Sequence, residues 1–338
     1  MALETNVAKR GMIATIVGIL SLPAPVAAAE PIIDMHIHGT MSERSRPVEA
    51  CPGNQPIDYL PVDPGRSGKD PQVIACRNPI KSALGFNDLR RDTISAFKRA
   101  RVVRAVVMGP IDRIERWRSD APGMIIPATA PDDPSPASLK RLQTLLSERR
   151  IDVIGEVALQ YRGLSADDPK WEDFWALVER ADVPVGIHLG EGMPMAGTLA
   201  RTELYRASLT SPFQLETVLK KHPKLRLYVM HAASPLTDEM IAMLFAYPAL
   251  HVDISANNWN MPRAHFHAQL QKLVDAGFSK RILFGSDQTL FPQAIGLAIA
   301  SINEAPFLTA LQKRDILYNN AARFLRLTKE QIAADHRQ

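Results

Sequence analysis

The stretch PIIDMHIHG, residues 31–39, is an apolar run that ends in two histidines one residue apart. In an extended strand, residues i and i+2 point to the same face, so His36 and His38 are expected to project together from its carboxyl end. Two imidazoles on one face can bind a divalent metal. An isolated H-x-H pair is more often two solvated or core histidines, so the rest of the chain must decide.

Seven further apolar runs follow, and amphipathic helical patterns lie between most of them. The runs occupy residues 103–109, 123–129, 152–159, 183–190, 225–231, 250–255 and 281–287; the helical patterns occupy 88–100, 138–150, 171–181, 212–221, 236–246 and 264–277. Apolar strands separated by amphipathic helices indicate a parallel sheet covered by helices. Eight such units predict an α/β fold, a (β/α)8 TIM barrel. A doubly wound sheet is the alternative, but no glycine-rich phosphate loop follows the first strand. Residues 289–327 are predicted to form the last helix and a helical C-terminal extension.

In such barrels, catalytic residues lie at the carboxyl ends of the strands. Six candidate metal ligands occupy those ends here: His36, His38, Glu156, His188, His231 and Asp287. Each alone has a structural explanation; Asp287, for example, can cap a helix. Their joint placement favours a divalent metal, with zinc as the first choice for these nitrogen-rich ligands and manganese as the alternative.

The N-terminal 29 residues have the parts of a secretory signal peptide. Lys9 and Arg10 precede an uncharged run of residues 11–29, which ends in the small residues Ala27 and Ala29. We expect cleavage before Glu30 and an exported protein, periplasmic or secreted, with a single barrel domain over residues 30–338. An uncleaved membrane anchor is the alternative, because a span needs about 17 to 25 residues.

The charge of the chain excludes some partners. The whole chain has a formal charge of +4; removing the leader, with Lys9, Arg10 and Glu4 (+1), leaves +3. No block of like charges concentrates this excess, so a nucleic-acid groove is not indicated. No second apolar run is long enough to span a bilayer. The expected partner is a small-molecule substrate, without stable membrane association after cleavage; a homo-oligomer is compatible with the sequence.

The two cysteines, Cys51 and Cys76, bracket a stretch rich in proline, glycine and aspartate. In an oxidising compartment this arrangement predicts a disulfide bond, and the alternative is two free buried thiols. Long loops in compact domains tend to be functional, so residues 40–85 are predicted to form an inserted loop after the first strand that covers the histidine pair.

These motifs together resemble the amidohydrolase superfamily. The resemblance rests on D-x-H-x-H at residues 34–38, GIH ending at His188, MH ending at His231 and LFGSD ending at Asp287, and it spans residues 31–327. It is strongest with the amidohydrolase-related branch that includes metal-dependent aromatic-acid decarboxylases. It implies a metal surrounded by His36, His38, His188 and Asp287, with His231 as a second-metal ligand or a proton-handling group.

The fourth strand departs from that branch. Its ending, IGEVALQY, is similar to TatD-type hydrolases, in which the glutamate can bridge two metals, and no lysine stands there as an alternative bridge. Glu156 therefore predicts a site for two ions if it bridges them. If it only orients a ligand, the site holds one.

The ligand set predicts a metal-dependent hydrolase of an amide, lactone or ester. A divalent metal lowers the pKa of water from about 16 to about 7, Asp287 would accept its proton, and His231 or a metal would polarise the substrate carbonyl. A non-oxidative decarboxylase or hydratase is the alternative, and a non-catalytic metal-binding protein is a further one. Substrate contacts are expected from loop residues Tyr161, Arg162, Glu191, Asn257, Asn258 and Trp259.

Overall fold

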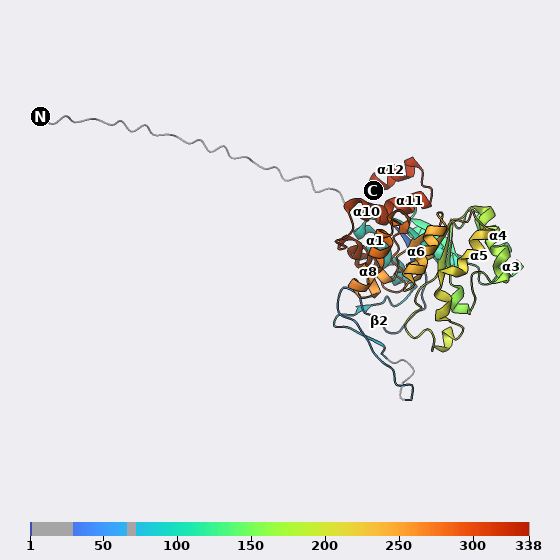
Figure 1. The fold of residues 1–338 in the computed structure, drawn as a ribbon, viewed down its shortest axis with the longest axis horizontal. Coiled ribbons are helices and arrows are strands. Elements are labelled where there is room, and N and C mark those ends of the chain that lie inside the picture. The colour runs from blue at the N-terminus through green and yellow to red at the C-terminus, as the bar shows by residue number, and fades with distance from the viewer. Residues whose placement is uncertain (2–29, 66–71, 338) are drawn as a thin grey trace.

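The computed structural model describes Met1 and residues 30–65 and 72–337 (Figure 1). The predicted signal peptide and its cleavage site therefore lie outside the described residues, apart from the first residue. Among the helices that are described, none combines the length and the apolar character needed to cross a bilayer.

Eight parallel strands form one sheet whose strand order follows the chain. They are β1 (Ile32–His38), β6 (Val102–Met108), β7 (Ile125–Thr129), β8 (Val153–Val157), β9 (Val185–His188), β10 (Leu227–Met230), β11 (His251–Asp253) and β12 (Ile282–Leu283). Two backbone hydrogen bonds join the last strand region to the first, from Met35 N to Phe284 O (2.9 Å) and from Asp287 N to His36 O (2.8 Å). The predicted TIM barrel is confirmed.

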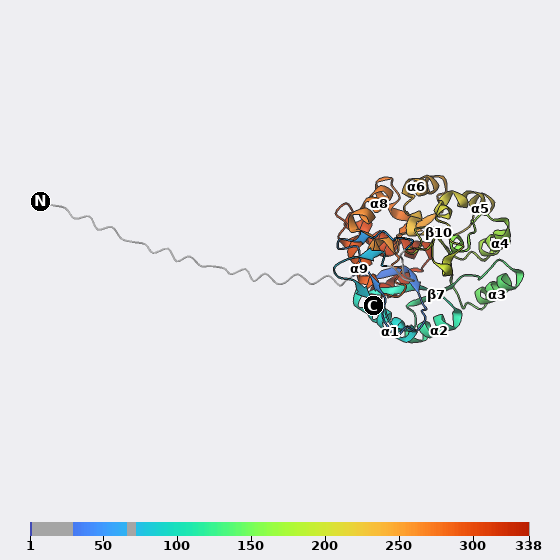
Figure 2. The same ribbon diagram turned by 90° about the horizontal axis from the view of Figure 1, so that it is seen from below.

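The helices surround the strands in chain order, as Figure 2 shows along the barrel. They are α1 (Phe86–Ala100), α2 (Ile111–Asp120), α3 (Pro136–Ser147), α4 (Glu172–Ala181), α5 (Leu215–Lys221), α6 (Thr237–Ala246), α8 (Arg263–Asp275) and α9 (Ala294–Asn303). All six predicted helical patterns form helices. The sequence did not indicate α2, because only Ile114 and Trp117 on it are buried and most of its other residues are charged.

The C-terminal extension closes the amino-terminal end of the barrel. It comprises α10 (Ala310–Arg314), a π-helical turn (Asp315–Asn319), α11 (Asn320–Phe324) and α12 (Lys329–Arg337). Tyr318 and Phe324 pack against barrel-interior residues such as Ile33 and Met35. Asp335 holds α12 in place because its buried carboxylate accepts hydrogen bonds from the Tyr318 hydroxyl (2.8 Å) and the Arg104 guanidinium (2.7 Å).

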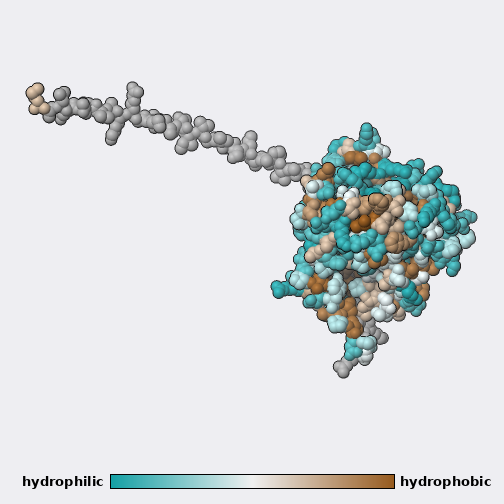
Figure 3. All heavy atoms as spheres, viewed as in Figure 1, coloured by the Kyte–Doolittle hydropathy of each residue, from teal (hydrophilic) through white to brown (hydrophobic). Residues whose placement is uncertain are grey.

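The predicted insertion lies at the opposite end of the barrel from α10, α11 and α12 (Figure 1). It contains two short antiparallel ladders, β2 (Glu49–Ala50) with β5 (Ile80–Lys81) and β3 (Asp58–Tyr59) with β4 (Ile74–Ala75). A disulfide bond joins Cys51 and Cys76, as predicted. The face of the molecule shown in Figure 3 is mostly hydrophilic, with scattered hydrophobic side chains, some of them on the projecting insertion.

Candidate metal centre

A β-bulge in β1 turns the two histidines toward the barrel interior. Asp34 pairs with Ala105 but Ile37 pairs with Val107, so β1 has one extra residue at this point. Ile33 and Met35 face the interior before the bulge, and Ile37 packs outside the barrel after it. The buried Asp34 carboxylate accepts hydrogen bonds from the amides of His36 (3.1 Å) and Ser286 (3.0 Å), which stabilises the bulge. Bulges commonly re-aim side chains beside active sites.

A second irregularity of the same kind lies in β8. Ile154 pairs with Val185 and Val157 pairs with Ile187, so β8 also has one residue more than its neighbour between these points. Glu156 lies within this irregular segment and reaches the histidines. The alternating pattern of a regular strand would not by itself place this carboxylate there, because a bulge changes which residues face inward.

His231 and Asp287 lie just beyond their strands, in strained backbone conformations. His231 has φ 61° and Asp287 has φ 49°, in the left-handed region that non-glycine residues rarely adopt. Strain of this kind costs about 1–3 kcal/mol and persists only where the surroundings enforce it. Close packing contributes: a Cβ on Gly285 would lie 2.8 Å from the Cβ of His36, so only glycine fits there.

The structure brings all six predicted ligands together at this rim. His38 Nε2 lies 3.0 Å and His36 Nε2 lies 3.6 Å from Asp287 Oδ1, forming one candidate metal-binding group. His188 Nδ1 and His231 Nε2 lie 2.5 Å and 3.5 Å from Glu156 Oε1, forming a second. The other oxygen of Glu156, Oε2, lies 3.4 Å from His38 Nε2. Glu156 thus belongs to the second group, and its other oxygen faces a histidine of the first.

The donor set fits divalent metal ions. Of the described buried side-chain atoms, His36 Nε2 and Asp287 Oδ1 are among those that lack a hydrogen-bond partner. Such atoms are costly to bury unless another partner satisfies them. Because these two atoms face each other with imidazole and carboxylate chemistry, a metal ion is the partner that accounts for both.

Asp253, at the end of β11, is a functional candidate that the sequence analysis missed. Its fully buried carboxylate lies 3.1 Å from His36 Nδ1 and accepts a hydrogen bond from the Ser255 hydroxyl (2.6 Å). That hydroxyl also lies 2.9 Å from His36 Nδ1 and 3.1 Å from His231 Nδ1. Since its proton goes to Asp253, its oxygen accepts from the imidazoles. Both Nδ1 atoms then carry hydrogen, which leaves both Nε2 lone pairs for metal.

The charges of the centre hold one another in the ionised state when no metal is bound. Burial alone would lower the pKa of His38, but Asp287 and Glu156 raise it to about 10. Burial likewise opposes protonation of His231, yet Glu156, Asp287 and Asp253 raise its pKa to about 9. Burial would raise the pKa of Asp287, but the surrounding imidazoles lower it to about 2. Protons therefore occupy the places that metal ions would take.

The predicted substrate-contact residues fall into two sets. Tyr161 lies at the centre, with its ring edge on His188 (5.2 Å) and its hydroxyl accepting a hydrogen bond from Met193 N (2.9 Å). Exposed Arg162 donates to the backbone carbonyl of Asp132, and exposed Glu191 accepts from Ser234 Oγ (2.9 Å). The side chains of the second set, Asn257, Asn258 and Trp259, are buried and donate to backbone carbonyls. In the structure these three side chains are bonded to the backbone, and their contact with a substrate stays a prediction.

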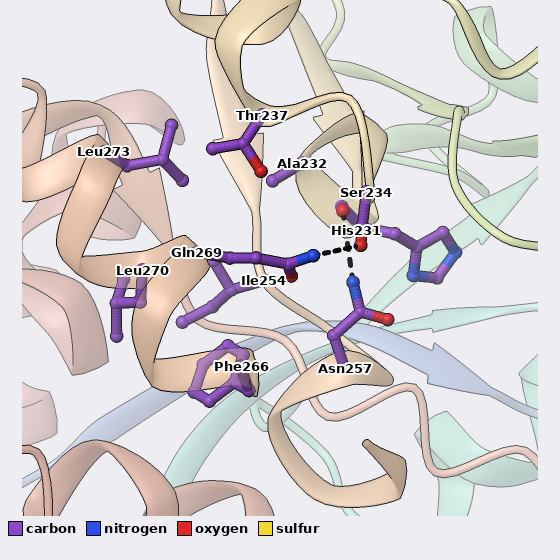
Figure 4. Close-up of a pocket in the computed structure, with 10 residues that line it drawn as sticks. All are labelled: His231, Ala232, Ser234, Thr237, Ile254, Asn257, Phe266, Gln269, Leu270 and Leu273. Carbon is purple, nitrogen blue, oxygen red and sulfur yellow. Dashed lines mark hydrogen bonds between the residues drawn. The ribbon is translucent and has the colours of Figure 1, made fainter. Parts of the chain in front are cut away.

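A small cavity of about 10 Å³ lies behind His231, between that residue and α8. Figure 4 shows that the imidazole of His231 points away from the other residues that line it. Gln269 donates to Ser234 Oγ across this space (2.8 Å). The cavity has room for about one water molecule, so it is a packing gap and not a substrate site.

A larger cavity, of about 420 Å³, opens directly from the metal centre. His38 and Glu156 line it at the centre, and one face of α3 lines it further out. That face consists of Ser138, Arg141, Leu142 and Leu145, the i, i+3, i+4 and i+7 positions of one helical stripe. The volume is within the range of small-molecule sites, about 300–1,000 Å³.

Comparison with known families identifies the chain. The amidohydrolase family model matches residues 33–327. This protein belongs to the amidohydrolase family. It is an enzyme of the metal-dependent amidohydrolase type, and the resemblance proposed from its motifs is confirmed at the level of the superfamily. A search of curated proteins finds no match.

Solved structures of this amidohydrolase's relatives share the fold at low sequence identity. A probable 2-pyrone-4,6-dicarboxylic acid hydrolase from Acinetobacter baumannii has a TM-score of 0.58 at 13% identity, covering 88% of this chain and 99% of that one. A 5-carboxyvanillate decarboxylase from Sphingomonas paucimobilis has a TM-score of 0.52 at 14% identity, covering 70% and 82%. A dihydroxybenzoic acid decarboxylase from a Polaromonas species, with bound manganese, has a TM-score of 0.54 at 13% identity, covering 73% and 91%. At this identity, the likeness shows the fold alone.

The placement of Glu156 predicts the metal stoichiometry. The amidohydrolase should bind two divalent ions per chain, and Glu156→Gln should lower this toward one, because the amide cannot supply two anionic oxygens. Elemental analysis after dialysis measures the ratio. Glu115→Gln, at an exposed glutamate of α2, is the control. A single ion in the unaltered protein, unchanged in Glu156→Gln, would contradict the bridging role.

The raised pKa values of His38 and His231 predict that metal binding releases protons. Both imidazoles are protonated at neutral pH in the metal-free protein, and an imidazole must lose this proton before it can bind a metal ion. Apparent affinity should therefore rise with pH up to about 10, the pKa of His38, by up to about tenfold per pH unit for each proton released. Titration calorimetry in buffers of different ionisation enthalpy measures the protons released. A pH-independent affinity between about pH 6 and pH 8 would show that the imidazoles are already neutral.

Proposed function

We propose that this amidohydrolase cleaves an amide, lactone or ester bond of a small molecule and uses two divalent metal ions. The observation that carries the proposal is the position of Glu156 between two ligand groups: Oε1 lies 2.5 Å from His188 Nδ1 in its own group, and Oε2 lies 3.4 Å from His38 Nε2 in the other. Zinc is our first choice because the donor set contains four imidazoles. Manganese is the alternative, since a structural relative holds it.

The residues around the centre supply the remaining chemistry. When bound, the metal ions lower the pKa of a water molecule and polarise the scissile carbonyl. Asp287, whose Oδ1 lies 3.0 Å from His38 Nε2 beside the proposed metal position, would accept the water's proton and return it to the leaving group. The Asp253–Ser255 pair keeps His36 and His231 in one orientation while this happens.

The cavity indicates the kind of substrate. Its walls combine apolar side chains, such as Leu142 and Leu145, with the guanidinium of Arg141. Arg141 lies on the cavity-facing stripe of α3, and it has no hydrogen-bond or ion-pair partner within the described part of the chain. We expect a compact, partly apolar substrate with an acidic or hydrogen-bond-accepting group toward α3. We therefore expect the guanidinium of Arg141 to bind an acidic group of the substrate. The guanidinium of Arg162 already donates to the backbone carbonyl of Asp132.

A decarboxylase or hydratase reaction of a carboxylic acid is the second candidate. Structural relatives with this fold include decarboxylases of carboxyvanillate and dihydroxybenzoic acids. On this alternative, the substrate carboxylate would lie at the metal group of His36, His38 and Asp287, and Glu156 would orient His188 without bridging.

The two reactions are distinguished by turnover. We expect the metal-loaded protein to hydrolyse members of a panel of lactones, esters and amides and to release no carbon dioxide from a panel of aromatic acids. Asp287→Asn should reduce hydrolysis by at least about 10²-fold, the usual scale for a general base, and should retain most of the metal through the histidines. Asp238→Asn, at an exposed aspartate of α6 outside the cavity, is the control. Decarboxylation without hydrolysis would overturn the proposal in favour of the second candidate.

We also propose that the protein is exported, to the periplasm or the medium. The disulfide bond supports this, because such bonds persist in oxidising compartments. Sequencing the N-terminus of protein purified from cells should give Glu30 as the first residue. An intact leader in a membrane fraction would favour the anchor instead.

A further inference from the structure

The short helix α7 (Asn257–Asn260) directs three consecutive side chains at backbone carbonyls of the metal centre. Asn257 Nδ2 donates to His231 O (3.4 Å), a contact visible in Figure 4. Asn258 Nδ2 donates to Gly285 O and Trp259 Nε1 donates to Ser286 O, both at 2.8 Å. The accepting carbonyls belong to one predicted ligand, His231, and to the two residues immediately before another, Asp287.

The backbone at His231 and at residues 285–287 needs stabilising contacts from outside the sheet. β10 ends at Met230 and β12 ends at Leu283, so both ligands lie beyond the regular hydrogen bonding of the sheet. Both also have left-handed backbone conformations, which the surrounding structure must enforce. The donors of α7 provide this support because they fix the carbonyls on either side of the centre.

The helix is itself held by the insertion. Gly53 N donates to Trp259 O (2.6 Å), and Gly53 O accepts from Arg263 N (2.8 Å). A Cβ at residue 53 would lie 1.5 Å from the carbonyl oxygen of Met261, so only glycine allows this approach. Gly53 is two residues from Cys51, whose disulfide partner is Cys76. The disulfide therefore constrains the segment that contacts α7.

We propose that α7 is a positioning bracket for the metal centre and that the disulfide-bonded insertion holds this bracket in place. Trp259 is its central residue: its indole binds the segment of Asp287, its carbonyl binds the insertion, and its ring packs on Phe291 (5.8 Å). The insertion therefore stabilises, through α7, the backbone segments that contain His231 and Asp287. The inference rests on the metal site of the proposed function.

The rate at which the protein loses metal to an excess of chelator tests this bracket. Trp259→Phe, Gly53→Ala and the double variant Cys51→Ser/Cys76→Ser should each speed the loss by about 10- to 100-fold, if it follows the affinity that is lost when the support of a metal ligand is removed. Trp175→Phe is the matched control, because Trp175 is equally buried and donates its indole hydrogen to a carbonyl (Ala166 O, 2.9 Å) away from the centre. Gly197→Ala is the loop control, since a Cβ there meets open space.

Amide hydrogen exchange of metal-depleted protein gives a readout that needs no metal. The amides of Ser286 and Asp287 are hydrogen-bonded to Asp34 and His36, so a peptide spanning residues 284–291 reports on this segment. It should exchange faster in the Gly53 and cysteine variants than in the Gly197 control. Combining Gly53→Ala with Trp259→Phe should add little to either change alone, because their two contacts act in series through residue 259.

Equal metal loss in Trp259→Phe and Trp175→Phe would overturn the inference. Unchanged exchange of residues 284–291 in the insertion variants would do so as well. If the unaltered protein bound no metal, the proposed function would fail, and the exchange comparison alone would decide whether the bracket exists.

Discussion

The closure of the barrel is the constraint on which the centre depends. β1 and the segment after β12 are about 250 residues apart in the sequence, yet the hydrogen bond from Asp287 N to His36 O joins them. This one seam places Asp287 Oδ1 3.0 Å from His38 Nε2. If the first and last strands did not meet, the histidine pair and the aspartate would occupy opposite edges of an open sheet, and no common metal group would form.

Regular strands alone do not account for the ligand positions. The bulges in β1 and β8 change which side chains face the barrel interior, and His231 and Asp287 adopt left-handed backbone conformations beyond their strands. Each departure costs free energy that the remaining structure must supply. Asp34 accepts a hydrogen bond within the first bulge. Asp253 and Ser255 contact the Nδ1 atoms of His36 and His231. The helix α7 donates to the backbone segments of His231 and Asp287.

The two ends of the barrel are divided between stability and chemistry. At the amino-terminal end, Tyr318 and Phe324 fill the interior with apolar contacts, and Asp335 accepts a hydrogen bond from the guanidinium of Arg104. At the carboxyl-terminal end, the interior is lined by charged groups that only metal ions or protons can balance. The insertion lies at this second end, where its disulfide and the contact of Gly53 with α7 link it to the centre.

The sequence by itself determined the strand–helix alternation, and with it the barrel, because burial on both faces makes parallel strands apolar and the covering helices amphipathic. It also located six candidate ligands, since strand ends can be read from where apolar runs stop, and it paired the only two cysteines. It did not indicate α2, whose buried face has two residues, or Asp253, which looks like an ordinary strand end. Only the tertiary structure decided that Asn257, Asn258 and Trp259 face backbone carbonyls, that Arg141 lines the cavity, and that Glu156 lies between His188 and His38. The reason is physical: these roles depend on bulges, left-handed residues and contacts between separate segments of the chain, and no local sequence pattern encodes such contacts.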